Sequence, residues 1–281
     1  MEINAPENLN ELAEVLQSYD MATTFLIAGG TDLINKIREN KCVDYNIVDL
    51  TKLEAMKGIE DKGCYIKIGA LTTMTDIIQN ECIKTHLTAL YQAAYELGST
   101  IIRNVATIGG NIANASQSAD VVLTLFAYDA DVVIMNQYGD VRRVAINELV
   151  IGRNMTSLKC GEVILEIHIP KERGVSVFKK IGSRKTVTIS KLSCALYSFS
   201  KDGSKHVRIY LGAIGVVPTR AVLLEQLFLE SQNPDLNQLS RCAYDEVEKA
   251  IPQRSSKYYK RVAIQGLMED VLKEFQHNAI V

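Results

Sequence analysis

Apolar residues recur at helical spacing near the start of the chain, and short strand-like runs follow them. Leu9, Leu12 and Leu16 fall on one face of a predicted helix. Asn8, followed three residues later by Glu11, predicts a capping box at the start of this helix. The same reading predicts strands over 23–27, 45–50, 65–68, 131–135, 141–144 and 163–169, and helices over 31–38, 72–79, 87–97 and 121–128.

The pattern changes near residue 175, where strands are followed by helices. Strands are predicted over 176–181, 192–200 and 206–214, and helices over 219–230, 236–251 and 258–276. Three strands followed by three helices predict a separate α+β domain with a three-stranded antiparallel sheet.

Two stretches are too small and polar for a core strand or helix. Thr107–Asp120 combines glycines, asparagines and hydroxyls, and Phe25–Ile34 has the same character. Small residues let a backbone approach another surface closely, so two loops gripping one extended polar ligand are expected. The strand, Gly29-Gly30 turn and helix, with Thr31 or Asp32 as the cap, would suit a phosphate at the helix start. The G-x-G-x-x-G fingerprint is absent, which argues against a doubly wound dinucleotide fold.

Length and composition indicate an ordinary globular protein with two or three lobes. The chain has 281 residues, 47% of them hydrophobic and 23% charged. A formal net charge of -2 argues against nucleic-acid binding. No apolar run approaches the roughly 20 residues that span a bilayer, and the start of the chain lacks signal-peptide character. A cytoplasmic protein is therefore expected.

Cysteine and histidine positions predict no metal site. The six cysteines are scattered without a C-x-x-C pair, so buried reduced thiols are the expectation. The four histidines form no H-x-x-x-H pair, and His168 is expected to be a surface or packed histidine in a strand. A Ser-His-Asp triad stays open, although no pattern favours one.

Plainer structural roles are open for the same residues. Each glycine pair could be a simple turn. Lys180 and Arg184 could be solvated charges on an edge strand, and Asp32 and Asp120 could be helix caps. A cap can also belong to a ligand loop.

Several motifs in order along the chain carry a resemblance to a known family. They are Ala28-Gly29-Gly30-Thr31-Asp32-Leu33, Arg103-Asn104-Val105-Ala106-Thr107-Ile108-Gly109-Gly110-Asn111, Phe178–Lys185 leading into Ile189–Leu192, and Tyr258-Tyr259-Lys260-Arg261. With them the chain resembles, nearly end to end, the flavin-binding subunit of the xanthine dehydrogenase and carbon monoxide dehydrogenase family of molybdenum hydroxylases.

The resemblance implies an α+β protein with an FAD-binding fold of the vanillyl-alcohol-oxidase type. Two α/β subdomains, 1–57 and 58–172, would hold the flavin, and 173–281 would be the C-terminal α+β domain. It further implies an FAD site made of Ile27, Ala28, Gly29, Gly30, Thr31, Asp32, Leu33 and Ile34, of Thr107, Ile108, Gly109, Gly110 and Asn111, and of Asp120, Ile164 and Lys180. Gln117 stands where many relatives carry proline, and the cysteine-rich insertion that holds an extra cluster in some relatives is missing.

The implied function is electron transfer. A large molybdenum-cofactor subunit would hydroxylate the substrate, and a small subunit with two [2Fe–2S] clusters would pass electrons to FAD in this chain. NAD+ or another acceptor would then take them. No catalytic acid or base is expected, because the flavin carries the redox chemistry. The alternatives are a stand-alone flavin reductase of the same fold and a flavin-free scaffold subunit.

Overall fold

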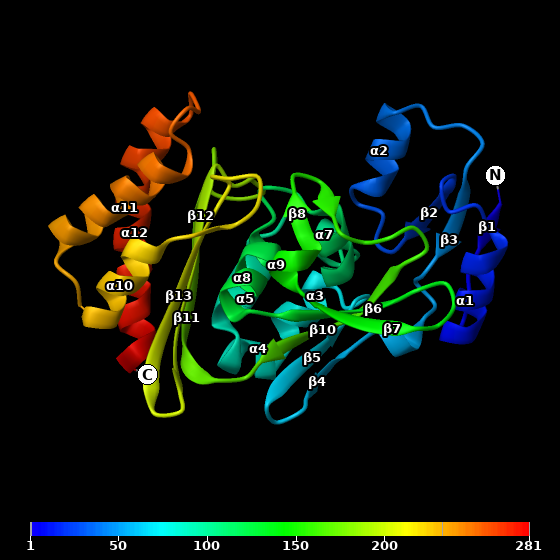
Figure 1. The fold of residues 1–281 in the computed structure, drawn as a ribbon, viewed down its shortest axis with the longest axis horizontal. Helices are drawn as coiled ribbons and strands as arrows, with labels where there is room; N and C mark the ends of the chain where they lie inside the picture. Colours follow the sequence, from blue (N-terminus) through cyan, green and yellow to red (C-terminus); the bar gives the residue numbers. More distant parts are fainter. Residues whose placement is uncertain (1, 232, 281) are drawn as a thin grey trace.

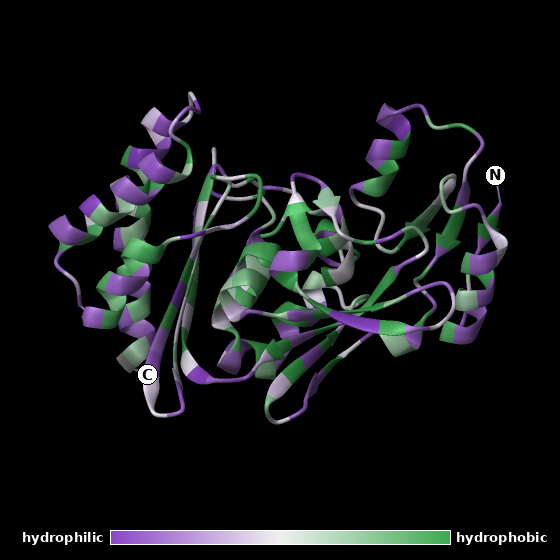
Figure 2. Ribbon diagram, viewed as in Figure 1, coloured by the Kyte–Doolittle hydropathy of each residue, from purple (hydrophilic) through white to green (hydrophobic). Residues whose placement is uncertain are grey.

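The structure, a computed structural model, describes residues 2–231 and 233–280. The three larger sheets lie in a row along the molecule, with the N-terminal sheet at one end and the helices α10–α12 at the other (Figure 1). Hydrophobic residues concentrate on the strands and on the helix sides that face them, while the outer helix α11 is largely hydrophilic (Figure 2).

The N-terminal sheet is parallel, with strand order β1-β3-β2. Its elements are β1 (Ile3–Asn4), α1 (Leu9–Ser18), β2 (Thr24–Ile27), α2 (Leu33–Glu39) and β3 (Asn46–Asp49). The predicted capping box of α1 is only half formed. The Asn8 side chain accepts the Glu11 N–H, but the Glu11 carboxylate accepts from the Glu7 N–H and the Asn8 side-chain amide, and not from the Asn8 backbone N–H. Leu12 and Leu16 are fully buried, as their spacing predicted.

The central sheet is antiparallel, in the order β4-β5-β10-β6-β7. Its strands are β4 (Ile59–Asp61), β5 (Tyr65–Gly69), β6 (Asp131–Met135), β7 (Val141–Ala145) and β10 (Val163–Pro170). The remaining elements of this part are η1 (Glu54–Met56), α3 (Met74–Gln79), α4 (Glu81–His86), α5 (Thr88–Tyr95), α6 (Thr100–Arg103), α7 (Ile108–Asn114), α8 (Asp120–Tyr128), α9 (Ile146–Leu149), β8 (Val150–Gly152) and β9 (Met155–Thr156). A bulge between Ile164 and Glu166 interrupts the pairing of β10 with β6, so it bends the strand where Ile164 reaches the cavity described below.

The predicted three-stranded C-terminal sheet is wrong, because four strands form it in the order β11-β12-β13-β14. The strands are β11 (Arg173–Ile181), β12 (Leu192–Lys201), β13 (Ser204–Gly212) and β14 (Thr219–Arg220), followed by α10 (Val222–Glu230), α11 (Leu236–Ala250) and α12 (Lys257–Ile280). Thr219 and Arg220 were expected to start a helix. They pair instead with Leu211 and Tyr210, because β13 offers hydrogen-bond partners to their backbone groups before the chain turns into α10.

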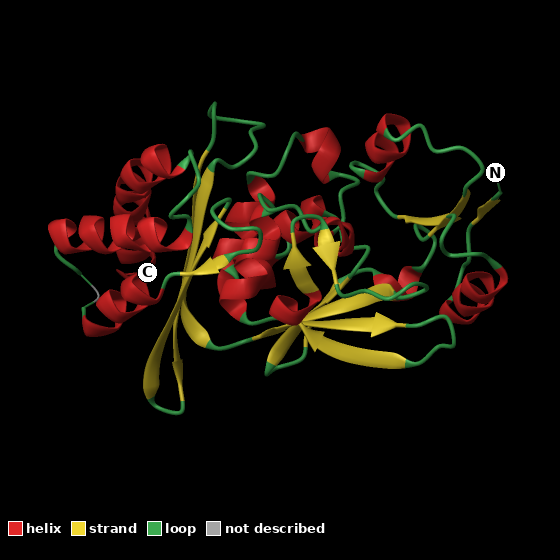
Figure 3. Ribbon diagram, turned by 45° about the horizontal axis from the view of Figure 1, so that its top comes forward, coloured by secondary structure: helices red, strands yellow, loops and turns green. Residues whose placement is uncertain are grey.

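Strand β12 is covered on both faces, by α12 on one side and by α5 and α8 on the other (Figure 3). Ala195, Tyr197 and Phe199 belong to the core of the central part. Leu192, Cys194 and Leu196 belong to the core under the C-terminal helices. Two hydrophobic cores therefore share a single strand, and the alternation of side chains along it assigns each residue to one core.

Among the described residues, no helix combines the length and the apolar character needed to cross a bilayer. The division at residues 57 and 172 stays a prediction.

Candidate functional site

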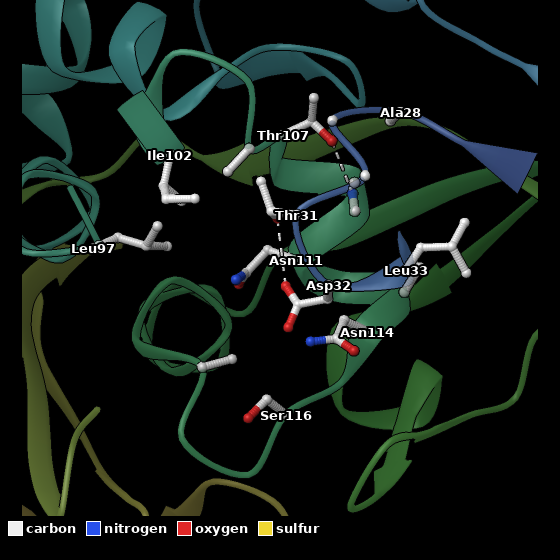
Figure 4. Close-up of a pocket in the computed structure, with 18 of the residues that line it drawn as sticks. Ala28, Thr31, Asp32, Leu33, Leu97, Ile102, Thr107, Asn111, Asn114 and Ser116 are labelled. Carbon is white, nitrogen blue, oxygen red and sulfur yellow. Dashed lines mark hydrogen bonds between the residues drawn. The ribbon is translucent and has the colours of Figure 1, made fainter. Parts of the chain in front are cut away.

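A cavity of about 700 Å³ lies where the three parts of the chain meet. The turn after β2, the helix α7, the first residues of β10 and the loop between β11 and β12 all contribute to its wall. Figure 4 shows Thr31 and Asp32 from the turn facing Asn111, Asn114 and Ser116, with Leu97 and Ile102 on another side. Its size and its mixed apolar and polar wall are those of a small-molecule or cofactor site.

The turn over residues 28–33 needs both of its glycines. A Cβ on Gly29 would lie 1.8 Å from the Val105 carbonyl oxygen, so only glycine allows this approach to the segment before α7. Gly30 has a φ of +67°, which favours glycine. The sharp turn therefore requires the Gly29-Gly30 pair from which it was predicted.

The same turn has backbone N–H groups without hydrogen-bond partners. Across the described residues, no hydrogen bond engages the N–H groups of residues 29–33, and these five residues line the cavity. Such a row of free amides is a concave anion site of the kind that binds phosphate. Asp32 precedes α2 without capping it through its side chain, so the predicted cap is wrong. Its carboxylate instead lies 3.4 Å from the Thr31 hydroxyl.

The second polar stretch is partly a helix, contrary to expectation. Residues Ile108–Asn114 form α7, and the Thr107 hydroxyl caps it by accepting the Gly110 N–H at 3.1 Å. Gly109 fits because its Cα packs against Ala70, where a Cβ would come within 2.7 Å of the Ala70 Cβ. Small residues thus serve helix packing here, and this role was not anticipated.

The first amides of α7 are already occupied. The N–H of Ile108 donates to the Thr72 carbonyl and that of Gly109 to the Ala70 carbonyl. α7 therefore offers the cavity the bare surface of Gly110 and the side chains of Asn111 and Asn114. The buried Oδ1 of Asn111 has no partner among the described residues, so it is an acceptor available to a hydroxyl or amide donor of a ligand.

Asp120 and Lys180 form a buried ion pair in the cavity wall. The Lys180 Nζ lies 3.1 Å from Asp120 Oδ2 and donates to the Glu96 carbonyl at 2.9 Å. The Ser190 hydroxyl also contacts both oxygens of Asp120, at 2.7 and 2.8 Å. The reading of Lys180 as a solvated charge and of Asp120 as a cap is wrong, because the side chains are 5% and 8% exposed and Asp120 makes no cap bond.

Burial raises the pKa of the Asp120 carboxyl, while the Lys180 ammonium and the Ser190 hydroxyl act in the opposite direction. Burial likewise raises the pKa of Glu96, the next acid beside Lys180. The pair places one positive and one negative group in a water-poor wall, where electrostatic interactions with a ligand are strong.

Thirteen of the sixteen predicted site residues line the cavity; the exceptions are Ile27, Ile34 and Ile108. Ile34 is 43% exposed and Ile108 is buried in the core. Residues missed by sequence reasoning include Lys36, Asn114, Ser116, Ser118, Glu162, Arg184, Val187, Thr188, Ile189 and Ser190. Asn114, Ser116 and Ser118 lie within the polar stretch already singled out, so its composition pointed to them. Lys36 had no such signal, and it enters through α2, where its Nζ donates to Asn114 Oδ1 at 2.5 Å.

The thiol prediction is only partly correct. All six cysteines are free, but Cys194 alone is buried, and Cys64 and Cys160 are exposed. The two exposed thiols stand in turns next to Gly63 and Gly161, which have positive φ, and such turns lie at the surface. His168 is packed as expected, between Glu166 (2.6 Å) and Arg143 (2.7 Å).

Known proteins with similar sequences and folds share this architecture. The family described as "FAD binding domain in molybdopterin dehydrogenase" matches residues 1–172. The putative xanthine dehydrogenase FAD-binding subunit of Escherichia coli K12 is 33% identical over 261 residues, covering 89% of this chain and 87% of that protein. The nicotinate dehydrogenase FAD-subunit of Eubacterium barkeri is 29% identical, covering 98% of this chain and 97% of that protein.

The fold is also that of a solved structure, the quinoline 2-oxidoreductase of Pseudomonas putida 86. It superposes with a TM-score of 0.90 at 21% identity, covering 100% of this chain and 98% of that one. The matched family residues contain both the amide-rich turn and α7. The chain therefore belongs to the family of FAD-binding domains of molybdopterin dehydrogenases, and it is an oxidoreductase subunit whose cofactor is FAD.

Proposed function

We propose that this chain is the FAD-carrying electron-transfer subunit of a molybdenum-containing hydroxylase of the xanthine dehydrogenase type. The observation that carries the proposal is the pairing, in one cavity, of five free backbone amides with the small polar face of α7. An FAD molecule has both chemistries that this wall would complement, a diphosphate and a polyhydroxyl chain. Free amides suit the first, and Asn111 and Asn114 suit the second.

The residue roles follow from this complementarity. The turn of residues 28–33 would hold the pyrophosphate, with Ile27 and Ile34 shaping its two ends, and α7 with Thr107 would hold the ribityl chain. Asp120, Ile164 and Lys180 would lie beside the flavin ring, where the ion pair fixes local charge. FAD supplies the redox chemistry when bound. The protein's part is to bind it, orient it and exclude water, and we propose no catalytic acid or base.

The remaining features of the proposal concern layout and partners. The fold would be of the vanillyl-alcohol-oxidase type, with FAD-binding subdomains 1–57 and 58–172 and a C-terminal domain 173–281. Relatives are named as FAD or medium subunits of xanthine, nicotinate and carbon monoxide dehydrogenases. We infer a large molybdenum-cofactor subunit and a small [2Fe–2S] subunit as partners in the cytoplasm, with NAD+ or another molecule as the electron acceptor.

Substitution of Gly110 by valine tests the cavity assignment. Gly110 lines the cavity, and a Cβ there would come within 2.9 Å of the Thr107 hydroxyl, a side-chain atom that can shift, and of nothing else within 4 Å. Gly110→Val should therefore fold but fail to retain FAD. The flavin absorption at about 450 nm, divided by the amount of purified chain, measures this. Gly266→Val in α12 is the matched control, because a Cβ at Gly266 meets nothing within 4 Å. Normal flavin content in Gly110→Val would contradict the assignment.

Co-purification separates the proposed subunit from the alternatives. Expression with its native partners should yield a complex that contains FAD, molybdenum and iron. A chain that binds FAD but associates with no partner would point to a stand-alone flavin reductase. A complex in which the chain carries no flavin would point to a scaffold subunit.

A further inference from the structure

Three side chains with different donor atoms meet outside the FAD cavity. Asp61 ends β4, while Cys82 and His86 stand four residues apart on α4 and so share one face of that helix. Their ligand atoms all lie within 4.8 Å of one another, and Cys82 Sγ is 3.9 Å from Asp61 Oδ2. The β4–β5 hairpin and α4 lie along the lower edge of the molecule in Figure 1. None of the three residues lines the cavity.

A thiolate, an imidazole and a carboxylate are the three side-chain ligands that Zn²⁺ takes in proteins. Zn–S and Zn–O bonds of about 2.3 and 2.0 Å at a tetrahedral angle separate sulfur and oxygen by about 3.5 Å. The 3.9 Å separation of Cys82 Sγ and Asp61 Oδ2 is close to this value. Asp61 and His86 are exposed and Cys82 is half-buried, so the side chains have room to close further.

We propose that Asp61, Cys82 and His86 form a Zn²⁺ site with three protein ligands and a water molecule in the fourth position. The expectation of no metal rested on the lack of a C-x-x-C pair. It overlooked the spacing of Cys82 and His86, because no helix was predicted over residues 81–86.

The Lys171 ammonium forms an ion pair with the Asp61 carboxylate. Lys171 Nζ lies 2.5 Å from Asp61 Oδ2, so a cation already occupies the acceptor side of that group. Zn²⁺ would have to displace this ammonium, which is only 21% exposed. Lys171 therefore competes with the metal, and its removal should strengthen Zn²⁺ binding.

Binding also exchanges a proton for the metal. Cysteine coordinates zinc as the thiolate, so the Cys82 thiol must lose its proton on binding. Coordination breaks the S–H bond, forms the Zn–S bond and releases the proton to the buffer. The metal would connect α4 to the end of β4. Because it would bind the folded chain and not the unfolded chain, it would raise the thermal stability of the protein.

Zn²⁺ titration of the full, untagged chain tests the proposal, with thiols kept reduced by a phosphine that does not bind zinc. One Zn²⁺ per chain is expected by calorimetry against a chromophoric chelator. Cys82→Ser and His86→Gln should each weaken binding by at least about 100-fold, more than the loss of an outer partner usually causes. Lys171→Met should tighten it. Co²⁺ in place of Zn²⁺ should give a thiolate charge-transfer band that Cys82→Ser lacks.

Two matched controls exclude binding elsewhere. Cys64→Ser removes an exposed thiol three residues beyond Asp61, and His277→Gln removes an exposed imidazole on α12; both should bind Zn²⁺ as the parent does. Circular dichroism checks that each variant folds, and Cys82→Ala replaces Cys82→Ser if the latter does not. Equal affinity in the parent and in the Cys82 and His86 variants would overturn the proposal. Absence of stoichiometric binding by Lys171→Met would also overturn it. Flavin content is measured separately, so failure here leaves the FAD assignment untouched.

Discussion

At the scale of single residues, the ion pair of Asp120 and Lys180 shows how far burial changes the role of a charge. Each side chain is at least nine-tenths buried, and each has the other as its nearest opposite charge. A buried pair contributes little net stability, but loss of one partner leaves the other charge without compensation. The local sequence cannot report this, because the two residues are 60 positions apart and meet only through the packing of α8 on the C-terminal sheet.

Asp120→Asn should lower the free energy of unfolding by about 3 kcal/mol or more, because Lys180 remains buried with only Glu96 nearby. Urea unfolding measures the loss. The double variant Asp120→Asn/Lys180→Met should recover part of it, since no uncompensated charge remains. A double variant as unstable as the sum of the single ones would show that the two charges are not coupled.

Glu162, in the cavity wall, makes the free energy of unfolding depend on pH. The Arg142 guanidinium donates two hydrogen bonds of 2.8 Å to its carboxylate and holds the pKa of Glu162 below the usual value. This stabilisation is complete above the unfolded pKa of about 4.3 and is lost as the pH falls through the lower folded pKa. Glu162→Gln should thus flatten the decline of unfolding free energy between about pH 5 and pH 3. Exposed Glu148→Gln, the control, should keep the parent's slope.

At the scale of elements, α7 shows both the reach and the limit of sequence patterns. Composition marked residues 107–120 as a ligand-facing stretch, and most of its polar residues line the cavity. The pattern missed the helix because only Ile108, Gly109 and Ile112 form its buried side, and a glycine adds nothing to an apolar pattern. Its stability comes from contacts that the local sequence does not contain, namely the hydrogen bonds from its first backbone N–H groups to the carbonyls of Ala70 and Thr72.

Thr107→Val removes the oxygen that caps α7 while keeping the shape of the side chain. The Gly110 N–H then loses its acceptor, and the unfolding free energy should fall by about 1 kcal/mol. Thr107→Ser retains the hydroxyl and should behave as the parent does in thermal unfolding. If Thr107→Val were as stable as the parent, the cap hydrogen bond would contribute nothing to the free energy of unfolding.

Strands were easier to predict than short helices across this chain. The apolar runs of β6 and β10 are mostly buried, and β5 alternates between buried and half-buried residues, so both patterns could be recognised in the sequence. α4 and α6 are only 6 and 4 residues long, too short to show a helical period. The two residues of β14 are likewise specified by their partner strand, which is distant in sequence.

At the scale of the whole molecule, the shared strand β12 joins the C-terminal part to the rest. Tyr197 and Phe199 complete the core that α5 and α8 begin, and the Tyr128 hydroxyl bonds to Ser176 of β11 at 2.6 Å. The proposed FAD cavity also takes wall residues from the loop between β11 and β12. The sequence predicted a separate C-terminal domain, but it could not show that this domain completes the other part's core and site.

A fragment of residues 1–172 should therefore neither fold stably nor hold FAD. It would expose the apolar sides of α5 and α8 and would lack Lys180 opposite Asp120. Near-ultraviolet circular dichroism and flavin content of the purified fragment measure both effects. A well-packed, flavin-containing fragment would contradict this dependence.

The alternation along β12 also restricts how the length of this chain can change. Deletion or insertion of one residue within 192–199 would exchange the two faces of the strand beyond that point. Leu196 and Tyr197 would then each enter the opposite core, so a single insertion or deletion would disrupt the packing of both cores. Length variation among related chains should accordingly fall in the turn at Asp202-Gly203, where both residues have positive φ and the backbone is exposed, and be absent from the strand itself.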